Sequence, residues 1–429
     1  MTPPRDEMIE SRAPAFRFVH CSDLHLDGPI VCEDDAVRRR LAEESRATLG
    51  RLVELCIAEQ AHALLVAGDL FDDERLSFGT EELLLASLGR LTRAGVSVVL
   101  ACGNHDNAAP GGRMSSLGWP SGVTVVGPEP TVVDVHDREG RLVGRVVAVG
   151  HGGPHDGARL IGRMPAAADD APSVAMLHGR CDGVRHAHLH EALAPFNTDD
   201  LAASGHRYWA LGHVHERQMV CRRPVAYYPG SLVAHGFSEP GLRGALLVSI
   251  VGRNDPRIEF RPLGVVRFET PDVTGLALAT DLSAVRAACV TAFESLRAED
   301  GRPESLWMLR FELSGPCPAA ADCQREDLLD EVGEELTSAL RPFGVLHVEV
   351  LDAGITHPVD LTPHAGRPNL LGEALAIAQS LNDDTVLDRL MPATLAGAGA
   401  ATDKRAYVRA LLKDIERAAA EALLKEVRP

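Results

Sequence analysis

The chain has 429 residues, enough for two or three domains, and 45% hydrophobic and 24% charged residues are typical of a globular protein. This composition excludes a mainly disordered or fibrous chain, and the apolar runs are far shorter than the ~20 residues of a membrane span. A net charge of −18 argues against a surface that binds nucleic acid by non-specific positive charge, although a metal site can neutralise phosphate locally. The polar N-terminus and nine scattered cysteines without a CxxC pair predict a soluble cytoplasmic protein with free thiols and no membrane association.

Residues 1–15 are predicted to form a flexible tail, and residues 16–265 a first domain in which apolar runs alternate with helical patterns. Helical spacing covers 37–56, and Thr80 is the predicted cap of a helix that ends near Gly95. Strands are predicted at Phe16–Cys21, Ala63–Ala67, Val96–Ala101, Thr124–Val126, Val143–Val149, Val174–Leu177, Tyr208–Leu211 and Ala245–Ile250. This alternation indicates a layered α/β fold, and the closely spaced later strands indicate a second sheet packed on the first.

The pattern changes near residue 265. Residues 266–357 alternate strand, helix, strand, helix and strand, which predicts a small α/β domain of its own. Residues 358–429 are predicted to hold a Pro-rich linker (358–370), a small-residue turn (396–401) and mainly helices. The last helix, Asp403–Val427, has apolar residues on one face at heptad-like steps, namely Val408, Leu411, Ile415, Ala419 and Ala422.

Five predicted strands end in side chains that can bind metal ions. These side chains are Asp23, His25, Asp69, Asn104, His178, His213 and His215. Sites in layered α/β folds assemble at the carboxyl ends of strands, and adjacent glycines allow the sharp turns that such a cluster needs. Seven nitrogen and oxygen ligands are too many for one ion, but they suit two ions that share a carboxylate. Ligands without thiolate favour Mn²⁺, Fe or Zn²⁺, and two such ions about 3.5–4 Å apart suit in-line displacement at phosphorus.

The order of these motifs resembles that of the calcineurin-like metallophosphoesterase superfamily over roughly residues 16–250. Within it, the chain is most similar to the DNA-repair exonuclease branch of SbcD-like and YhaO-like proteins. The motifs that carry the resemblance are Val19–Asp27 (VHCSDLHLD), Gly68–Asp72 (GDLFD), Leu177–Gly179 (LHG), Trp209–Arg217 (WALGHVHER) and Tyr228–Ser231 (YPGS), followed by Glu239, Pro240, Gly241 and Gly244.

The resemblance implies two packed β-sheets flanked by helices, and it assigns the ligands. Asp23, His25 and His215 would hold one ion, Asn104, His178 and His213 the other, and Asp69 would bridge them. His105 would lie beside the scissile phosphate without binding metal. The implied reaction is hydrolysis of a DNA phosphodiester by a metal-bridging hydroxide that attacks phosphorus in line, while a protonated His105 assists the leaving oxygen.

The resemblance also implies partners. Residues 266–357 would form a capping domain, and the terminal helices would dock on the coiled coil of an SMC-like ATPase. The heptad-like face at Asp403–Val427 fits such a dock, although an ordinary core-packing helix fits the same pattern. Members of this superfamily often form homodimers, but the sequence identifies no interface for one.

One position departs from the pattern of the branch. Archaeal and eukaryotic nucleases of this type carry a histidine three residues after the bridging aspartate, where this chain has Asp72. Related phosphatases carry an aspartate there, paired with the histidine of their Gly-Asn-His motif. We therefore predict that Asp72 orients His105 and keeps it protonated, the alternative being a capping or surface aspartate.

Other residues have weaker signals. His235 and Arg217 are candidates for substrate contacts, with a surface salt bridge as the alternative for Arg217, and His151 is a candidate for lining the site. The alternating histidines His186, His188 and His190 are predicted to be a solvated loop or a rim that faces substrate. Two other functions stay open at this point: a phosphodiesterase or phosphatase for small molecules, and an accessory ATPase subunit with little activity.

Overall fold

The computed structural model describes residues 15–412 and 415, except residues 31, 33, 73–74, 156–158, 169–170, 186–190, 359–360, 362–363, 365, 382 and 391–400. The predicted tail therefore lies outside the described residues, apart from its last residue. The chain divides into two compact units. The first comprises Met1–Pro271, Glu299–Arg310 and Glu334–Glu349, and the second comprises Asp272–Ala298, Phe311–Gly333 and Val350–Pro429. The domain boundaries at 265 and 357 stay predictions.

The first unit contains a six-stranded sheet in the order β12-β11-β1-β2-β3-β4. Its strands are β1 (Ala15–Cys21), β2 (Ala63–Ala67), β3 (Ser97–Ala101), β4 (Val123–Val126), β11 (Gly244–Val251) and β12 (Arg257–Pro262). Strands β1 to β4 are parallel, whereas β11 is antiparallel to both β1 and β12. The helices that connect the parallel strands are α1 (Asp35–Ala58) and α2 (Phe78–Arg93), and the short α3 (Arg113–Ser116) precedes β4.

A second six-stranded sheet has the order β5-β6-β7-β8-β10-β9. Its strands are β5 (Thr131–His136), β6 (Leu142–Val149), β7 (Ser173–His178), β8 (Tyr208–Gly212), β9 (Gln218–Arg222) and β10 (Val225–Tyr228). Strands β6, β7, β8 and β10 are parallel, and the edge strands β5 and β9 are antiparallel to their neighbours. Helix α4 (Thr198–Ala203) and a 3-10 turn, Leu160–Arg163, lie in its connections.

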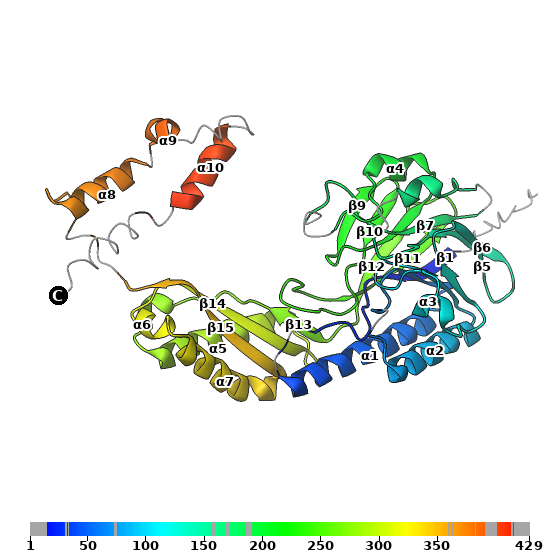
Figure 1. Ribbon diagram of the computed structural model, residues 1–429, viewed down its shortest axis with the longest axis horizontal. Helices are drawn as coiled ribbons and strands as arrows, with labels where there is room; N and C mark the ends of the chain where they lie inside the picture. Colours follow the sequence, from blue (N-terminus) through cyan, green and yellow to red (C-terminus); the bar gives the residue numbers. More distant parts are fainter. Residues whose placement is uncertain are drawn as a thin grey trace, which may run out of the picture. The chain divides into compact units, whose positions relative to one another are not determined.

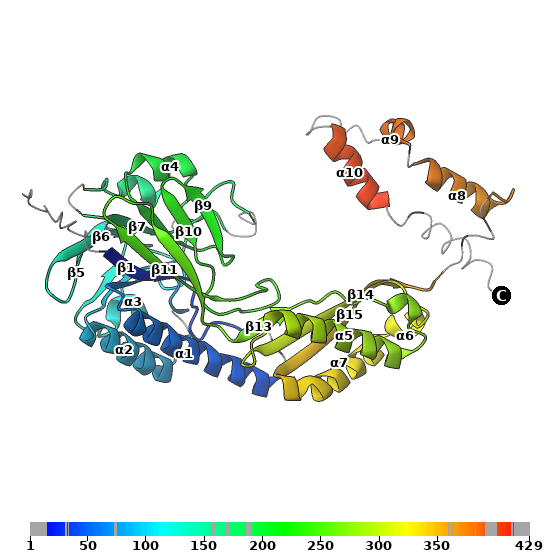
Figure 2. The same ribbon diagram turned by 180° about the vertical axis from the view of Figure 1, so that it is seen from behind.

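The two sheets pack face to face, as the sequence predicted. Their shared core includes Phe16 and Phe18 of β1, Val146 of β6, Tyr208 of β8 and Val248 of β11, each fully buried. Helices α1 and α2 cover one side of this sandwich and α4 lies on the opposite side (Figures 1 and 2). The central strands are mainly apolar because both of their faces are covered.

Four strands and one helix cap differ from the sequence predictions. Strands β5, β9, β10 and β12 were not predicted. Polar side chains interrupt or flank the short apolar stretches of the edge strands β5, β9 and β12, and the apolar run of β10 spans only four residues. The predicted cap Thr80 is wrong: α2 begins at Phe78, and Ser77 is its N-cap, accepting a hydrogen bond from the Thr80 backbone N–H at 3.3 Å. Thr80 is buried in the first turn, and its hydroxyl donates to Asp27 at 2.9 Å.

The strand–helix alternation predicted after residue 265 is confirmed. A three-stranded sheet has the order β13-β14-β15, formed by β13 (Val266–Glu269), β14 (Leu306–Pro316) and β15 (Val345–Thr356). The helices between them are α5 (Leu282–Asp300), α6 (Ala320–Cys323) and α7 (Glu326–Leu340), with 3-10 turns at Leu276–Leu278 and Arg341–Phe343.

The C-terminal region contains α8 (Leu370–Ser380), α9 (Asp384–Leu390) and α10 (Ala401–Leu412). Most of the predicted turn at 396–401, parts of the linker, and Ala419 and Ala422 of the heptad-like face lie outside the described residues. None of the described helices is long and apolar enough to cross a membrane.

Candidate metal centre

The predicted ligands lie at or just after the carboxyl ends of five strands, β1, β2, β3, β7 and β8. Backbone hydrogen bonds join the loops at these strand ends. The Asp23 N–H donates to the Gly68 carbonyl at 3.1 Å, and the His25 N–H donates to the Asp69 carbonyl at 3.0 Å. The His213 N–H donates to the Asp23 carboxylate, at 3.1 Å from Oδ1. Segments almost two hundred residues apart thus meet at one edge of the sandwich.

Four of the seven predicted ligands have a left-handed backbone. The φ angles are 51° at Asp23, 43° at His25, 53° at Asp69 and 98° at His213. Non-glycine residues rarely adopt this conformation, and such strain concentrates where a site requires side chains to converge.

Two glycines allow the loops to approach one another. At Gly68, whose φ is 88°, a Cβ atom would lie 2.3 Å from His178 Nδ1. At Gly103 a Cβ atom would lie 2.1 Å from Asp69 Oδ1. Any larger residue at these positions would displace a predicted ligand, which is a physical reason for glycine beside the cluster.

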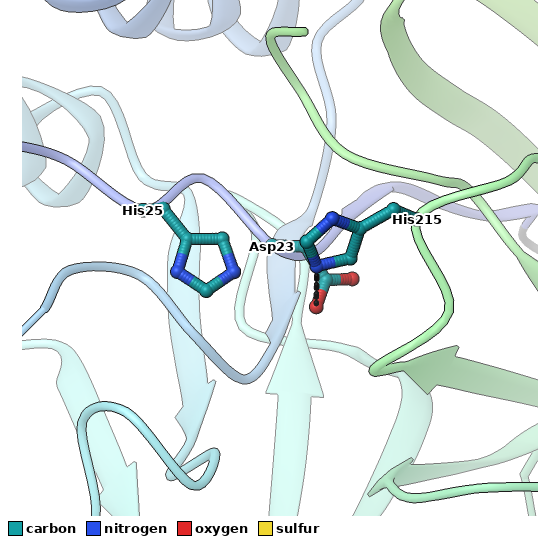
Figure 3. A group of neighbouring side chains, drawn as sticks. All are labelled: Asp23, His25 and His215. Atoms are coloured by element: carbon teal, nitrogen blue, oxygen red, sulfur yellow. Dashed lines mark ion pairs between the residues drawn. The ribbon is translucent and has the colours of Figure 1, made fainter. Parts of the chain in front are cut away.

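The first predicted ligand set lies together. One ligand atom from each of Asp23, His25 and His215 falls within 4.8 Å of the others. His215 Nε2 is 3.7 Å from Asp23 Oδ1, and Figure 3 shows this contact, with the His25 imidazole to one side of the pair. The three side chains are buried or partly buried, and they bring nitrogen and oxygen atoms together in one cluster.

The second predicted set lies beside the first. His178 Nε2 is 3.1 Å from Asn104 Oδ1, and the rings of His178 and His213 have centroids 5.2 Å apart. Asp69 joins both sets, because its Oδ2 lies 3.3 Å from His178 Nε2 and 3.7 Å from His25 Nε2. Asp69 therefore occupies the position expected of a carboxylate shared by two ions.

Each of the four candidate histidine ligands has a ring nitrogen hydrogen-bonded to a backbone carbonyl or to a carboxylate outside the ligand set. His178 Nδ1 donates to the Ala67 carbonyl at 2.8 Å, and His213 Nε2 donates to the Glu191 carbonyl at 2.9 Å. Two others pair with carboxylates: His25 Nδ1 with Asp72 at 2.9 Å, and His215 Nδ1 with Glu239 at 2.7 Å. Such bonds set the tautomer and the ring orientation of metal-binding histidines and leave the other nitrogen for the ion.

The donor set fits divalent cations. His25 Nε2 is buried and has no hydrogen-bond partner within the described part of the chain. Burial lowers the pKa of both His178 and His215, but their carboxylate neighbours outweigh it. The charge of Asp69 helps to raise the pKa of His178 to about 9, and the hydrogen bond that His215 donates to Glu239 helps to raise the pKa of His215 to about 9. The buried carboxylates thus attract positive charge, which bound cations would supply in place of these protons.

His105 and Asp72 lie together beside the first predicted ligand set. His105 Nδ1 is 3.3 Å from Asp72 Oδ1, and its half-exposed ring is 4.8 Å from the His25 ring. The hydrogen bond with Asp72 raises the pKa of His105, while burial opposes the shift. The His105 N–H also donates to Asp69 Oδ1 at 2.9 Å, which fixes the loop between the two sites.

Two supporting residues, Glu239 and Asp106, were missed as functional positions, whereas the third, His151, was a candidate for lining the site. Glu239 holds His215, Asp106 accepts hydrogen bonds from the backbone of two ligand loops, and His151 Nε2 donates to the His178 carbonyl at 2.8 Å. Glu239 and Asp106 stand in recognised motifs, but only the fold shows what they contact. Through this hydrogen bond, His151 holds the backbone of the predicted ligand His178.

The weaker candidates lie in different places. The His235 ring is 5.4 Å from the His25 ring, close enough to line the site. Arg217 stacks on Phe260, with its guanidinium carbon 3.7 Å from the ring centroid, and has no salt bridge to a described carboxylate. The histidines at 186, 188 and 190 lie outside the described residues.

Comparisons with known proteins identify relatives of this chain. A family model described as calcineurin-like phosphoesterase matches residues 16–217. The uncharacterized metallophosphoesterase YhaO of Bacillus subtilis is 30% identical over 327 residues, which cover 74% of this chain and 76% of that protein. A protein of Rhodobacter capsulatus that is named as a subunit of nuclease SbcCD is 31% identical over 283 residues (56% of this chain, 68% of that protein). The Bacillus subtilis protein of the same name is 30% identical over 257 residues (53% and 64%).

A search of solved structures matches a dimetal phosphatase from Danio rerio at a TM-score of 0.33 and 12% identity, covering 57% of this chain and 98% of that one. This TM-score is too low to support an inference about function.

Proposed function

The chain belongs to the calcineurin-like phosphoesterase family, in its SbcD-like and YhaO-like branch, and from this premise we propose that it is a dinuclear-metal-dependent phosphodiesterase that cleaves DNA. Membership of the family makes it a metal-dependent hydrolase of phosphate esters. The choice of DNA is supported by the two relatives named as nuclease subunits.

The observation that carries the proposal is the place of Asp69 Oδ2. This one oxygen lies within 3.7 Å of a histidine nitrogen from each predicted ligand set. A carboxylate so placed is suited to two adjacent ions rather than one. Such an ion pair lowers the pKa of water and neutralises charge on the phosphoryl oxygens. We propose Mn²⁺ as the metal, with Fe or Zn²⁺ as alternatives that the same ligands suit.

The protein supplies the proton for the leaving oxygen. Asp72 contacts His105 Nδ1, so His105 Nε2 is the nitrogen left to face the substrate. The raised pKa of His105 favours the imidazolium form, which can donate a proton to the leaving alkoxide. The buried carboxylates and imidazoles are already held by hydrogen bonds, so little reorganisation is needed when substrate binds.

A nuclease assay with Mn²⁺ tests the proposal. We expect the wild-type protein to degrade linear DNA, Asp69→Ala to abolish the activity, and His105→Ala to lower kcat by about 10²–10⁴-fold. His136→Ala, a change at an exposed histidine of β5, is the matched control and should retain full activity. Wild-type protein that contains two ions and leaves DNA intact would contradict the DNA substrate.

A small-molecule phosphodiesterase is the competing function, and the net charge of −18 favours it. The two differ in substrate. Linear duplex and single-stranded DNA should be hydrolysed with higher kcat/KM than bis(p-nitrophenyl) phosphate or cyclic nucleotides. The reverse order would favour the small-molecule function, and a metal-loaded protein inactive on all of them would favour an accessory role beside an ATPase.

Two relatives are named as subunits of the SbcCD nuclease, and they support a partner for this chain. We propose an SMC-like coiled-coil ATPase as this partner and the C-terminal helices as the dock. We also propose that the protein forms a homodimer and is located in the cytoplasm. Co-purification of the full chain with a tagged ATPase encoded beside it would test the partner.

A further inference from the structure

A groove opens at the edge of the sandwich, between the two sheets. Its walls come from β9 and β10 of one sheet, β11 and β12 of the other and the segment 183–185, and they include Arg185, Arg217, Met219, Tyr227, Ile258 and Phe260. Its volume is about 1110 Å³, including the part open to solvent. We call it the Arg217 groove.

The strand register places this groove at the same end of the sandwich as the candidate metal centre. Strand β10 is parallel to β8, and Tyr227 pairs with Ala210, two positions before β8 ends at Gly212. Phe260 pairs with Leu246, which pairs with His20 near the end of β1. Arg217 itself follows His215 by two positions, which limits the separation of their Cα atoms to about 7 Å.

The guanidinium of Arg217 is positioned so that it can bind an anion. Its guanidinium lies over the Phe260 ring, 3.7 Å from the centroid, and within the described residues it forms no salt bridge. The neighbouring Arg185 differs, because it pairs with Glu216 at 2.9 Å. A guanidinium stacked on an aromatic ring is held in one orientation and keeps its edge donors available for a planar or tetrahedral anion.

The rest of the groove offers apolar surface. Met219 is 40% exposed, and Tyr227 and Phe260 are partly buried in the wall. Basic groups combined with aromatic side chains are typical of surfaces that bind single-stranded nucleic acid, because bases stack on the rings and phosphates meet the cations. A polynucleotide has further phosphates and bases beside the cleaved one to place on such a surface, whereas a small phosphodiester has none.

We propose that the Arg217 groove binds the nucleotide adjacent to the cleaved one in a single-stranded polynucleotide, with Arg217 donating to its phosphate. The inference rests on the proposed phosphodiesterase function and gives it a strand-binding subsite. Arg217 is a substrate-binding residue in this arrangement and takes no part in the bond cleavage.

Substrate discrimination tests the groove. With Mn²⁺, Arg217→Ala should lower the ratio of kcat/KM for a single-stranded oligonucleotide to kcat/KM for bis(p-nitrophenyl) phosphate by about tenfold to a hundredfold, as expected for a lost hydrogen bond to a charged group. Phe260→Leu should lower the ratio less, because the Arg217 guanidinium remains and loses only the aromatic ring on which it stacks. Arg222→Ala removes the same charge from an exposed position at the end of β9, outside the groove, and should leave the ratio unchanged.

Binding provides a readout independent of turnover. For a fluorescent phosphorothioate oligonucleotide, the slope of log K against log salt should decrease in magnitude by about 0.7 in Arg217→Ala, the loss of one phosphate contact to a single strand. Arg217→Lys should restore this slope while recovering only part of the affinity, since lysine keeps the charge without the planar stack.

The outcomes separate this inference from the proposed function. If the wild-type protein cleaves oligonucleotides and Arg217→Ala behaves like Arg222→Ala, the proposed role of the Arg217 groove is wrong, but the proposed nuclease function is not contradicted. If the wild-type protein hydrolyses bis(p-nitrophenyl) phosphate but neither binds nor cleaves oligonucleotides, both are wrong.

Discussion

One carboxylate oxygen of Asp72 contacts two histidines that have different predicted roles. Oδ1 lies 2.9 Å from Nδ1 of His25, a candidate ligand, and 3.3 Å from Nδ1 of His105, the candidate proton donor. Burial works against the ionised form, yet hydrogen bonds from both histidines hold the pKa of Asp72 well below its ordinary value. The sequence predicted only the contact with His105, so the link to His25 is an addition from the structure.

The pH dependence of Asp72→Asn tests its role. Activity that needs protonated His105 is lost as pH rises through the His105 pKa, and the Asp72 hydrogen bond and charge raise that pKa. Removing the charge lowers the pKa, so the basic limb of the pH–rate profile should move to lower pH. The measurement needs saturating metal, because the substitution also disturbs His25. An unchanged basic limb would show that Asp72 does not act on His105.

Glu239 supports the first ligand set in the way that Asp72 supports His25. It accepts hydrogen bonds from His215 Nδ1 and from the Ser231 hydroxyl, each at 2.7 Å. Glu239→Gln should therefore weaken Mn²⁺ binding at one of the two sites by about 10–100-fold, measured by calorimetric titration. Glu139→Gln, on an exposed turn, is the control. Equal Mn²⁺ affinity in both variants would leave Glu239 a purely structural residue.

At the scale of elements, Asp106 joins the loops after β2 and β3. Its buried carboxylate accepts the backbone N–H groups of Gly103 at 2.7 Å, Leu70 at 2.7 Å and Asp69 at 3.1 Å. Burial and the charge of Asp69 raise the pKa of Asp106 to about 7, while the backbone donors oppose the shift. Asp106 thus sets the spacing between Asp69 and the Asn104–His105 segment without facing the pocket.

Asp106→Ala should cost both stability and metal binding. Three backbone donors lose their acceptor, so the free energy of unfolding should fall by about 3 kcal/mol or more, measured by urea denaturation of the metal-free protein. Asp134→Ala, at a surface ion pair with Arg145, should cost less than about 1 kcal/mol. Equal losses in the two variants would mean that Asp106 does not join the loops.

The whole molecule carries a net charge of −18, part of which is buried at the candidate site. Divalent ions would offset that charge and hold five loops together, so they should stabilise the fold. We expect the Tm to rise on addition of Mn²⁺. When the free Mn²⁺ concentration is a hundred times its Kd, the free energy of unfolding should increase by about 2.7 kcal/mol.

The same stabilisation should depend on pH. The pKa of about 9 at His178 and His215 means that both carry protons near neutral pH in the metal-free protein. Metal binding must displace these protons, so affinity should rise with pH by about tenfold per pH unit for each proton displaced. The rise in Tm should therefore be larger at about pH 8 than at about pH 6, and a pH-independent rise would contradict this account.

The sequence by itself determined the sandwich, the order of its central strands along the chain and the seven candidate ligands. Central strands are covered on both faces and therefore appear as continuous apolar runs, and polar ligands that follow such runs mark strand ends. Strand β12 at a sheet edge was missed because its apolar side chains alternate with charged ones and form no continuous run.

Only the tertiary structure decided which groups touch. The sharing of Asp72 by His25 and His105, the support of His215 by Glu239, and the stacking of Arg217 on Phe260 each join residues that lie far apart in the chain. Hydrogen bonds and ring stacking depend on distances of a few ångströms, whereas a one-dimensional pattern specifies only periodicity and order. Side chains brought together by packing thus leave no spacing in the sequence from which their contact could be predicted.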